Sequence, residues 1–178
     1  MKNHLRMEVS SKYWQINLLL PNQNKRLMKG SYTVEPASPP DFEEITSVWE
    51  ASVRATHHFL DEEAIQYYRP LVLHEYLKSV TLFCSRDDHD RIVGFLGISG
   101  RKLEMLFIKP DNRGKGIGEL LLNYAIDIMG IDSVDVNEQN EQAIGFYKRY
   151  GFKITRRSEV DGLGKPYPVL HMELDDAG

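Results

Sequence analysis

The sequence of 178 residues holds one cysteine, no long apolar run and only a small excess of charge of one sign. The single thiol, Cys84, excludes an intramolecular disulfide and a cysteine-rich metal site, and such cysteine usage is typical of a reducing cytoplasm. We therefore expect a cytoplasmic protein without a metal ion, in which Cys84 is a small apolar residue buried on a strand.

Membrane spans, secretory signals and strong basic charge are also missing from the sequence. No stretch approaches the roughly 18 to 20 consecutive apolar residues that a membrane span needs. The apolar run at residues 18–20 is stopped by Pro21, and no small-residue cleavage pattern follows it, which argues against a secretory signal. The formal net charge is -4, without the basic footprint of a nucleic-acid-binding protein. We therefore expect neither a membrane nor a nucleic acid as a partner.

The length and the apolar content of 42% fit one domain with a substantial core. The first 27 residues are polar and weakly patterned, and they precede a second methionine, Met28, after which the patterning becomes regular. We expect the functional domain at residues 28–178. Residues 1–27 are expected to be an N-terminal extension, either disordered or upstream of the natural start.

After Met28 the hydrophobic pattern alternates between strand-like and helix-like segments. Strands are expected at residues 32–34, 80–84, 92–98, 103–108, 133–136, 152–155 and 169–174. Helices are expected after the N-cap Ser38, at about 61–78 with a bend at Pro70, at 117–129 and at 141–150. This mixed order predicts an α/β (α+β) fold with a mixed central sheet of about six to seven strands, flanked by helices on both faces.

The stretch KPDNRGKGIG, residues 109–118, carries three alternate glycines directly before an expected helix. A P-loop requires Ser or Thr after its lysine, but Gly116 follows Lys115. A dinucleotide fingerprint requires a third glycine where Glu119 stands. A glycine-rich turn without a ligand stays open for any one of the glycines, but it accounts poorly for three together.

Alternate glycines let several backbone N–H groups point the same way and remove side chains that would hold a ligand off. A helix that begins near Ile117 leaves its first amides unpaired and adds the positive end of its dipole. Arg113 and Lys115 place full positive charges beside these groups. The segment therefore predicts a binding site for a pyrophosphate.

The run EMLFIKPDNRGKGIGELLL resembles the acetyl-CoA-binding motif of the GNAT superfamily of N-acetyltransferases, whose signature R/Q-x-x-G-x-G/A is here Arg113, Gly116 and Gly118. The stretch NEQNEQAIGFYKRYGF resembles the second motif of that family, and ATHHFL and SEVDGLGKPYP are similar to its bacterial YjaB-like branch. The resemblance covers about Tyr32 to Leu174. It implies the GNAT acyl-CoA N-acyltransferase fold, acetyl-CoA as the acetyl donor, an amine acceptor (protein lysine, peptide or small molecule), and a monomer or homodimer.

The resemblance also implies that the strand at 103–108 splays from its neighbour and pairs its backbone with the pantetheine arm of the cofactor. The expected cofactor-binding residues are Leu106, Phe107, Ile108, Arg113, Gly114, Lys115, Gly116, Ile117, Gly118, Asn137, Asn140 and Phe146. The three apolar strand residues would by themselves indicate only a core. Asn140 is also a good N-cap for the helix that begins at Glu141.

Tyr147 and Glu104 are the leading candidates for moving protons. Tyr147 stands at the family's general-acid position, and a phenol with a pKa of about 10 can protonate a thiolate; a core aromatic is the alternative. Glu104 stands where many family members carry an acid that serves as the base. Strand alternation puts Glu104 on the face of Leu106 and Ile108, opposite Leu103 and Met105, so we expect it to be partly buried. A structural acid is the alternative.

His57 and His58 lie in the expected turn between the first two helices, which borders the acceptor groove in the family. His57 is a candidate for taking a proton or binding the acceptor, and His58 and Tyr167 are candidates for binding it. Tyr167 belongs to a loop stiffened by two prolines, which is expected to rim the acceptor site or to be only a connection. The alternative function is a non-catalytic acyl-CoA-binding or regulatory protein on the same fold. A dinucleotide-dependent enzyme would require a different glycine spacing.

Overall fold

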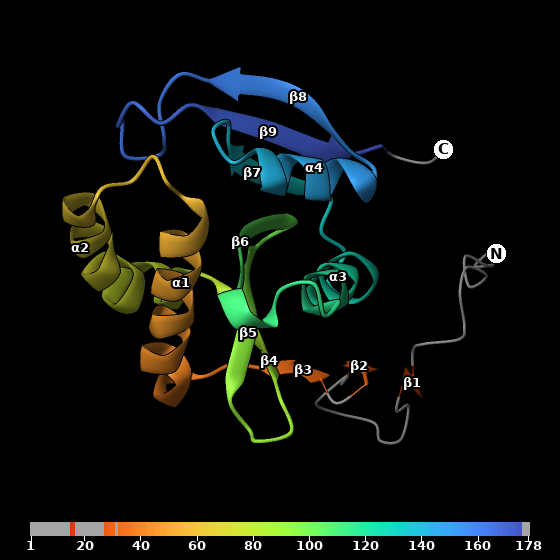
Figure 1. The fold of residues 1–178 in the computed structure, drawn as a ribbon. Coiled ribbons are helices and arrows are strands. Elements are labelled where there is room, and N and C mark those ends of the chain that lie inside the picture. The colour runs from red at the N-terminus through yellow and green to blue at the C-terminus, as the bar shows by residue number, and fades with distance from the viewer. Residues whose placement is uncertain (1–14, 17–26, 31, 176–178) are drawn as a thin grey trace.

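The computed structural model describes residues 15–16, 27–30 and 32–175. In this part of the chain a central sheet is covered by helices on both faces (Figure 1). The sheet order is β1-β2-β3-β4-β5-β6-β7-β9-β8. The strands are β1 (Gln15–Ile16), β2 (Leu27–Lys29), β3 (Tyr32–Pro36), β4 (Thr81–Arg86), β5 (Ile92–Ser99), β6 (Lys102–Ile108), β7 (Ser133–Asn137), β8 (Phe152–Ser158) and β9 (Val169–Leu174).

The predicted mixed sheet is confirmed, because β6 and β7 run parallel whereas the other neighbouring strands run antiparallel. All seven predicted strands are present as β3 to β9. Two short strands, β1 and β2, were not predicted and add to the β3 edge of the sheet. Most of the expected N-terminal extension lies outside the described residues, so the domain boundary at residue 28 stays a prediction.

The helices begin where the capping residues predict. The turn η1 (Pro39–Asp41) leads into α1 (Phe42–Thr56), and the Ser38 N–H donates to an Asp41 carboxylate oxygen at 2.8 Å. The helix α2 (Glu62–Leu71) is capped by Asp61, which accepts from the Ala64 N–H at 2.8 Å. Its α-helical turns end one residue after Pro70, because proline removes a backbone donor, and helical turns of other pitch, η2 (Val72–Tyr76) and η3 (Leu77–Ser79), follow.

The remaining helical segments lie after β6 and after β7. The short turn η4 (Pro110–Asn112) precedes α3 (Ile117–Asn123), which continues as η5 (Tyr124–Ile128), and α4 (Glu141–Arg149) precedes β8. The predicted N-cap role of Asn140 is confirmed, since its side-chain oxygen accepts from the Ala143 N–H at 3.1 Å. None of the helices in the described part of the chain is both long and apolar enough to cross a membrane.

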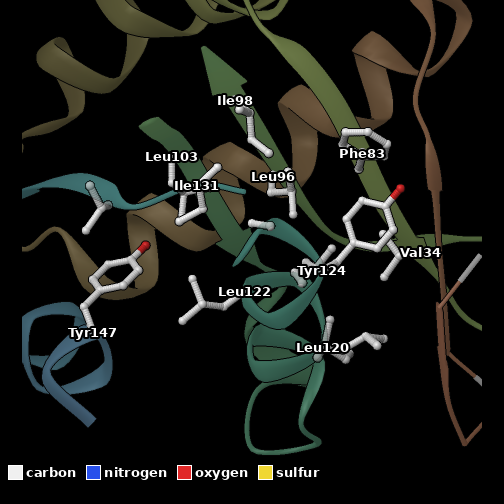
Figure 2. Packing of buried hydrophobic residues seen from close by; sticks show 14 of the residues in the cluster. Val34, Phe83, Leu96, Ile98, Leu103, Leu120, Leu122, Tyr124, Ile131 and Tyr147 are labelled. Carbon is white, nitrogen blue, oxygen red and sulfur yellow. The ribbon is translucent and has the colours of Figure 1, made fainter. Parts of the chain in front are cut away.

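The two faces of the sheet are buried under different helices. One face is covered by α1 and α2 (Figure 1). These helices pack over a cluster that includes Ile45, Trp49 and Phe95. On the other face, α3 packs over a cluster that includes Leu96 and Leu122 (Figure 2). Fully burying one such side chain contributes about 1.5 to 3 kcal/mol, so both faces add substantially to stability.

Cys84 is fully buried on β4, as predicted. Burial raises the pKa of its thiol to about 12, because an apolar surrounding disfavours the thiolate. The thiol is therefore an inert apolar side chain of the core rather than a reactive group.

Candidate active site

The parallel strands β6 and β7 pair only where they begin. Lys102 lies opposite Ser133 and Leu103 lies opposite Val134, and no further pairing follows. Where the two strands separate, a cavity of about 470 Å³ opens between β6, β7, α1, α4 and the start of α3. The splay that the family resemblance implied is therefore present, and it gives the cavity a wall of unpaired strand edge.

Glu104 occupies a β-bulge at the point of this separation. In the pairing of β5 with β6, Gly97 lies opposite Met105 and Ile98 lies opposite Leu103, so Glu104 has no partner on β5. Bulges of this kind disrupt the ladder and re-aim a side chain, often beside an active site. The Glu104 side chain lines the cavity and is 34% exposed.

The predicted facing of the residues around Glu104 was wrong, and the bulge is the reason. Strict alternation predicted that Leu103 shares a face with Met105. In the structure Leu103 packs with Leu106 and Ile108 on the α3 face, whereas Met105 packs on the α1 face. The extra residue shifts the alternation by one position and leaves Glu104 open to the cavity.

The glycine turn before α3 forms the second wall. Gly114 and Gly116 have φ angles of 72° and 81°, which lie in the left-handed region that favours glycine. The backbone N–H groups of residues 114–118 donate to no acceptor among the described residues. Of these residues all except Lys115 line the cavity, and the exposed Lys115 side chain does not reach it. The turn therefore presents a set of free backbone donors to an anionic ligand.

The side chain of Arg113, the residue before the glycine turn, extends toward α1. One of its terminal nitrogens donates to the Ser52 hydroxyl at 2.9 Å and to the Ser52 carbonyl at 3.3 Å. Burial lowers the pKa of Arg113, but a guanidinium keeps its charge at neutral pH. No carboxylate pairs with it in the part of the chain that the structure describes. Arg113 therefore supplies a positive charge that the protein leaves uncompensated at the edge of the cavity.

Tyr147 lies on α4 and is only 6% exposed. Its ring packs edge-on against Phe146 and Phe152, with centroid distances of 5.3 and 5.6 Å. The hydroxyl has no hydrogen-bond partner among the described residues, and it points from α4 toward the strands that border the cavity (Figure 2). Burial raises the pKa of Tyr147, so the phenol keeps its proton at neutral pH. In the part of the chain that the structure describes, the phenol is therefore a proton donor without an acceptor.

His57 caps the end of α1 and also lines the cavity. Burial lowers the pKa of its imidazole to about 4, with further lowering by the charges of Arg113 and His58, so the ring is neutral at physiological pH. The Thr56 hydroxyl donates to the Ser52 carbonyl at 2.8 Å and lies 2.8 Å from Nδ1 of His57. Because the hydroxyl has one proton, its oxygen must accept from Nδ1–H, which leaves Nε2 as an acceptor.

A row of aromatic rings leads from His57 away from the cavity. The His57 and Phe59 ring centroids are 5.2 Å apart, and those of Phe59 and Tyr167 are 5.8 Å apart. Asp161 holds the loop that carries Tyr167, since it accepts the Tyr68 hydroxyl at 3.1 Å and two backbone N–H groups of its own loop. Tyr167 does not line the cavity, and only the ring of Phe59 connects it to His57. His58 is exposed and does not line the cavity either.

A chain of polar contacts leads from Glu104 along the sheet. The Lys102 ammonium lies 3.3 Å from Glu104 and 2.7 Å from Asp135. The other oxygen of Asp135 lies 2.6 Å from Nδ1 of His171, whose Nε2 lies 2.8 Å from the Ser158 hydroxyl. Lys102, Asp135 and His171 were not predicted, because their contacts join strands that are distant in sequence.

The structure brings together most of the predicted site. The cavity is lined by all three catalytic candidates and by the predicted cofactor-binding residues apart from Lys115, namely Leu106, Phe107, Ile108, Arg113, Gly114, Gly116, Ile117, Gly118, Asn137, Asn140 and Phe146. Lining residues that the sequence analysis missed include Ser52, Thr56, Met105, Asn112, Glu119, Asp135, Gln142 and Arg149. Ser52 and Thr56 follow each other at helical spacing beside an apolar stripe, and that pattern could have indicated them.

Residues 46–174 match the family described as "Acetyltransferase (GNAT) domain". The chain belongs to the GNAT acetyltransferases. This GNAT chain is 46% identical over 130 residues to the peptidyl-lysine N-acetyltransferase YjaB of Escherichia coli strain K12, and the match covers 73% of this chain and 88% of that relative.

Two solved structures are similar to this GNAT domain. The solution structure of apo-form YjaB from Escherichia coli has a TM-score of 0.73 at 42% identity, covering 82% of this chain and 99% of that chain. The PaiA N-acetyltransferase from Thermoplasma acidophilum, solved in complex with coenzyme A, has a TM-score of 0.62 at 26% identity, covering 81% and 99%. The predicted fold and the resemblance to the GNAT superfamily and its YjaB-like branch are therefore confirmed.

Membership of this family confirms the predicted reaction, which is acetyl transfer to an amine. The chain is an acetyltransferase that takes the acetyl group from acetyl-CoA and transfers it to an amine. The dinucleotide alternative is set aside. Among the described residues no group of three or more His, Cys, Asp and Glu side chains is arranged to hold a metal ion.

Proposed function

We propose that this GNAT acetyltransferase acetylates lysine side chains of proteins or peptides, with direct transfer from acetyl-CoA. The observation that carries the proposal is the cavity between β6 and β7, in which Tyr147, Glu104 and His57 face one space beside a turn of free backbone donors. The similarity to YjaB, which is named a peptidyl-lysine N-acetyltransferase, supports lysine as the acceptor.

The residues that line the cavity fit a long anionic thioester. Acetyl-CoA supplies a thioester whose carbonyl carbon an amine can attack and whose sulfur leaves as a thiolate that needs a proton. The free N–H groups of residues 114–118 and the guanidinium of Arg113 would bind its phosphates. The edge of β6 after Leu103 has no β7 partner, so it offers backbone donors and acceptors to an amide-containing arm.

Tyr147 is the residue that we assign as general acid. Its hydroxyl holds a proton at neutral pH, borders the cavity and has no acceptor among the described residues that would compete for that proton. An acid positioned in this way typically contributes about 10²- to 10⁴-fold to the rate. The proton would pass from the phenol oxygen to the departing sulfur.

Glu104 is the residue that we assign as the base, acting on the acceptor directly or through water. A lysine acceptor has a pKa of about 10.4, so at neutral pH it arrives as an ammonium that a carboxylate attracts and that must lose a proton. His57 is neutral with a free Nε2, but its pKa of about 4 makes it a weak base. The geometry therefore favours His57 as a hydrogen-bond acceptor for the substrate, with Tyr167 and His58 farther along the same side.

We also propose that the enzyme works in the cytoplasm. The lone Cys84 thiol is buried and inert, which is compatible with a reducing compartment. The subunit number, monomer or homodimer, stays a prediction that size-exclusion chromatography with light scattering would test.

The test is release of coenzyme A from acetyl-CoA with lysine peptides, polyamines and aminoglycosides as acceptors, run for wild type and Tyr147→Phe. We expect peptides with a free lysine side chain to be acetylated, and the same peptides with a blocked side chain to be inert. The variant should lose about 10²-fold or more in kcat while the KM for acetyl-CoA stays within about twofold.

Tyr124→Phe is the matched control, because Tyr124 is another buried tyrosine on a helix and does not line the cavity. It should retain wild-type turnover. Unchanged turnover in Tyr147→Phe would remove the assignment of the acid. Acetylation confined to small-molecule amines would remove lysine peptides as the substrate class, and acetyl-CoA binding without transfer to any amine would support a binding protein instead.

A further inference from the structure

The Lys102 ammonium forms ion pairs with two carboxylates, those of Glu104 and Asp135. Lys102 and Glu104 are on β6, and Asp135 is on β7, where the two strands separate. The Lys102 ammonium lies 2.7 Å from Asp135 but 3.3 Å from Glu104. The shorter distance marks a direct charge-assisted hydrogen bond to Asp135, and the longer one a weaker contact with Glu104. Lys102 is thus held mainly by the carboxylate that the reaction does not use.

Asp135 is itself fixed by the neighbouring strands. Its Oδ1 atom lies 2.6 Å from Nδ1 of His171 on β9, and Nε2 of His171 lies 2.8 Å from the Ser158 hydroxyl on β8. With Nδ1 carrying the proton, His171 donates to Asp135 and accepts from Ser158. The two oxygens of Asp135 therefore have different partners, and the one that faces β6 remains directed at Lys102.

The hydrogen-bond sequence from Ser158 through His171 to Asp135 is similar to that of a hydrolase triad, but the surroundings of Ser158 do not support a role as a nucleophile. Arg156 also donates to the Ser158 hydroxyl, at 3.1 Å, and Ser158 does not line the cavity. Asp135, in contrast, lines it beside Glu104. The polar chain therefore ends at the active site through Asp135 and Lys102.

We propose that Asp135 is a positioning residue that draws the shared Lys102 ammonium toward itself, so that Lys102 does not pair fully with Glu104 and the Glu104 carboxylate can bind the cationic amine of the acceptor. The inference rests on the proposed function of Glu104. Two carboxylates and one ammonium leave one net negative charge at this point of the cavity. Without Asp135, Lys102 would pair with Glu104 alone, and its ammonium would repel the ammonium of the acceptor from that carboxylate.

Although burial disfavours its charge, Lys102 has a raised pKa because of Asp135 and Glu104, so it remains an ammonium at the pH of the reaction. The competition is therefore between two cations, Lys102 and the acceptor, for one carboxylate. Asp135 reduces the competition from Lys102, so its loss should change the KM for the acceptor and not the KM for acetyl-CoA.

The experiment compares wild type with Asp135→Asn, Lys102→Met and the double variant, using a lysine peptide and acetyl-CoA. Asp135→Asn should raise the KM for the peptide about tenfold or more, since an unneutralised like charge then faces the acceptor. The KM for acetyl-CoA should stay within about twofold. Lys102→Met should restore the peptide KM in the Asp135→Asn background. A carboxylate with a merely structural role would not be rescued by the loss of Lys102.

Asp132→Asn is the matched control. Asp132 binds Arg101 at the same distance of 2.7 Å, close to the start of β7, and does not line the cavity. It should leave both KM values unchanged. A double variant as impaired as Asp135→Asn, or an Asp135→Asn variant with the wild-type peptide KM, would overturn the proposal.

The position of the Lys102 ammonium gives a readout that does not need turnover. In a crystal structure of Asp135→Asn, the ammonium should lie at direct hydrogen-bond distance from Glu104, closer than the 3.3 Å of the wild type. An unchanged distance between Lys102 and Glu104 in this variant would overturn the inference even if the enzyme is active. If no amine is acetylated but the ammonium moves to Glu104, the proposed function fails while the contact that Asp135 controls is established.

Discussion

Ser85 on β4 is fully buried, and its hydroxyl is the one buried side-chain polar atom of the described residues that has no hydrogen-bond partner. A buried hydroxyl without a partner loses its hydrogen bonds to water and gains none in return. Ser85→Ala removes that group and keeps the backbone pairing of β4 with its two neighbours. We therefore expect this substitution in the core to stabilise the protein.

The expected size follows from two opposing contributions. Burying an unpaired hydroxyl costs about 1 to 3 kcal/mol in mutational data, and the alanine variant recovers this amount. The void left by one oxygen atom costs less than the ~1 kcal/mol of a methyl-sized cavity. The net gain in the free energy of unfolding should be about 1 kcal/mol, which for a domain of this length raises Tm by about 2 to 4 °C.

Urea unfolding of wild type and Ser85→Ala measures this gain directly, provided that the m-value is the same in both proteins. Cys84→Ser is the matched comparison, because Cys84 is the adjacent residue of the same strand and is also 0% exposed. It introduces a buried hydroxyl and should destabilise by about 1 to 3 kcal/mol. A loss of 1 kcal/mol or more in Ser85→Ala would refute the reasoning, because it would mean that the hydroxyl is hydrogen-bonded in the native protein.

Three further predictions concern two walls of the cavity and the loop that carries Tyr167. The pKa of His57 is about 4 in the folded state, below its ordinary 6.5, so the unfolded chain binds more protons between these values and stability falls as the pH drops. Between pH 7 and pH 5 this loss should be about 2 kcal/mol, and His57→Gln should remove it; an equal loss in both proteins in urea titrations would contradict the assignment. Gly116→Ala and the control Gly130→Ala both place a side chain at positive φ and should each cost about 1 to 2 kcal/mol, but only Gly116→Ala should raise the KM for acetyl-CoA. Asp161→Ala should free the loop from Tyr68 and raise the KM for the acceptor severalfold at constant KM for acetyl-CoA, and equal effects on both would argue for general loosening.

Local signals predicted the elements of this fold because the interactions that define them are close in sequence. Ser38 and Asp61 precede helices that begin where capping predicts, and all seven strands of the expected domain follow their apolar patterns. The glycine turn was also predicted correctly as a set of free backbone donors at the start of a helix. A pattern of residue types over a few positions contains this information.

The details of the site depend on pairings between distant residues, and these could not be read locally. The bulge at Glu104 exists only in the register of β6 against β5. The contact of Asp135 with His171 depends on β9 lying between β7 and β8. Arg113 and Lys115 were both predicted to bind the cofactor, yet only Arg113 lines the cavity, because the left-handed turn at Gly114 separates the directions of the two side chains.

The position of the active site follows from the one parallel pair among the described strands. Two parallel strands joined at their starts and separated afterwards leave unpaired backbone groups along both inner edges. Buried groups of this kind destabilise a protein unless something pairs with them. The bulge of β6 against β5 lies at Glu104, directly after the last pair of β6 with β7, and Gly116 starts α3 at the end of the opening. The opening therefore offers its unpaired groups to a ligand that supplies backbone-like hydrogen bonds and anionic oxygens together, and the coenzyme A thioester that we propose for this site has both.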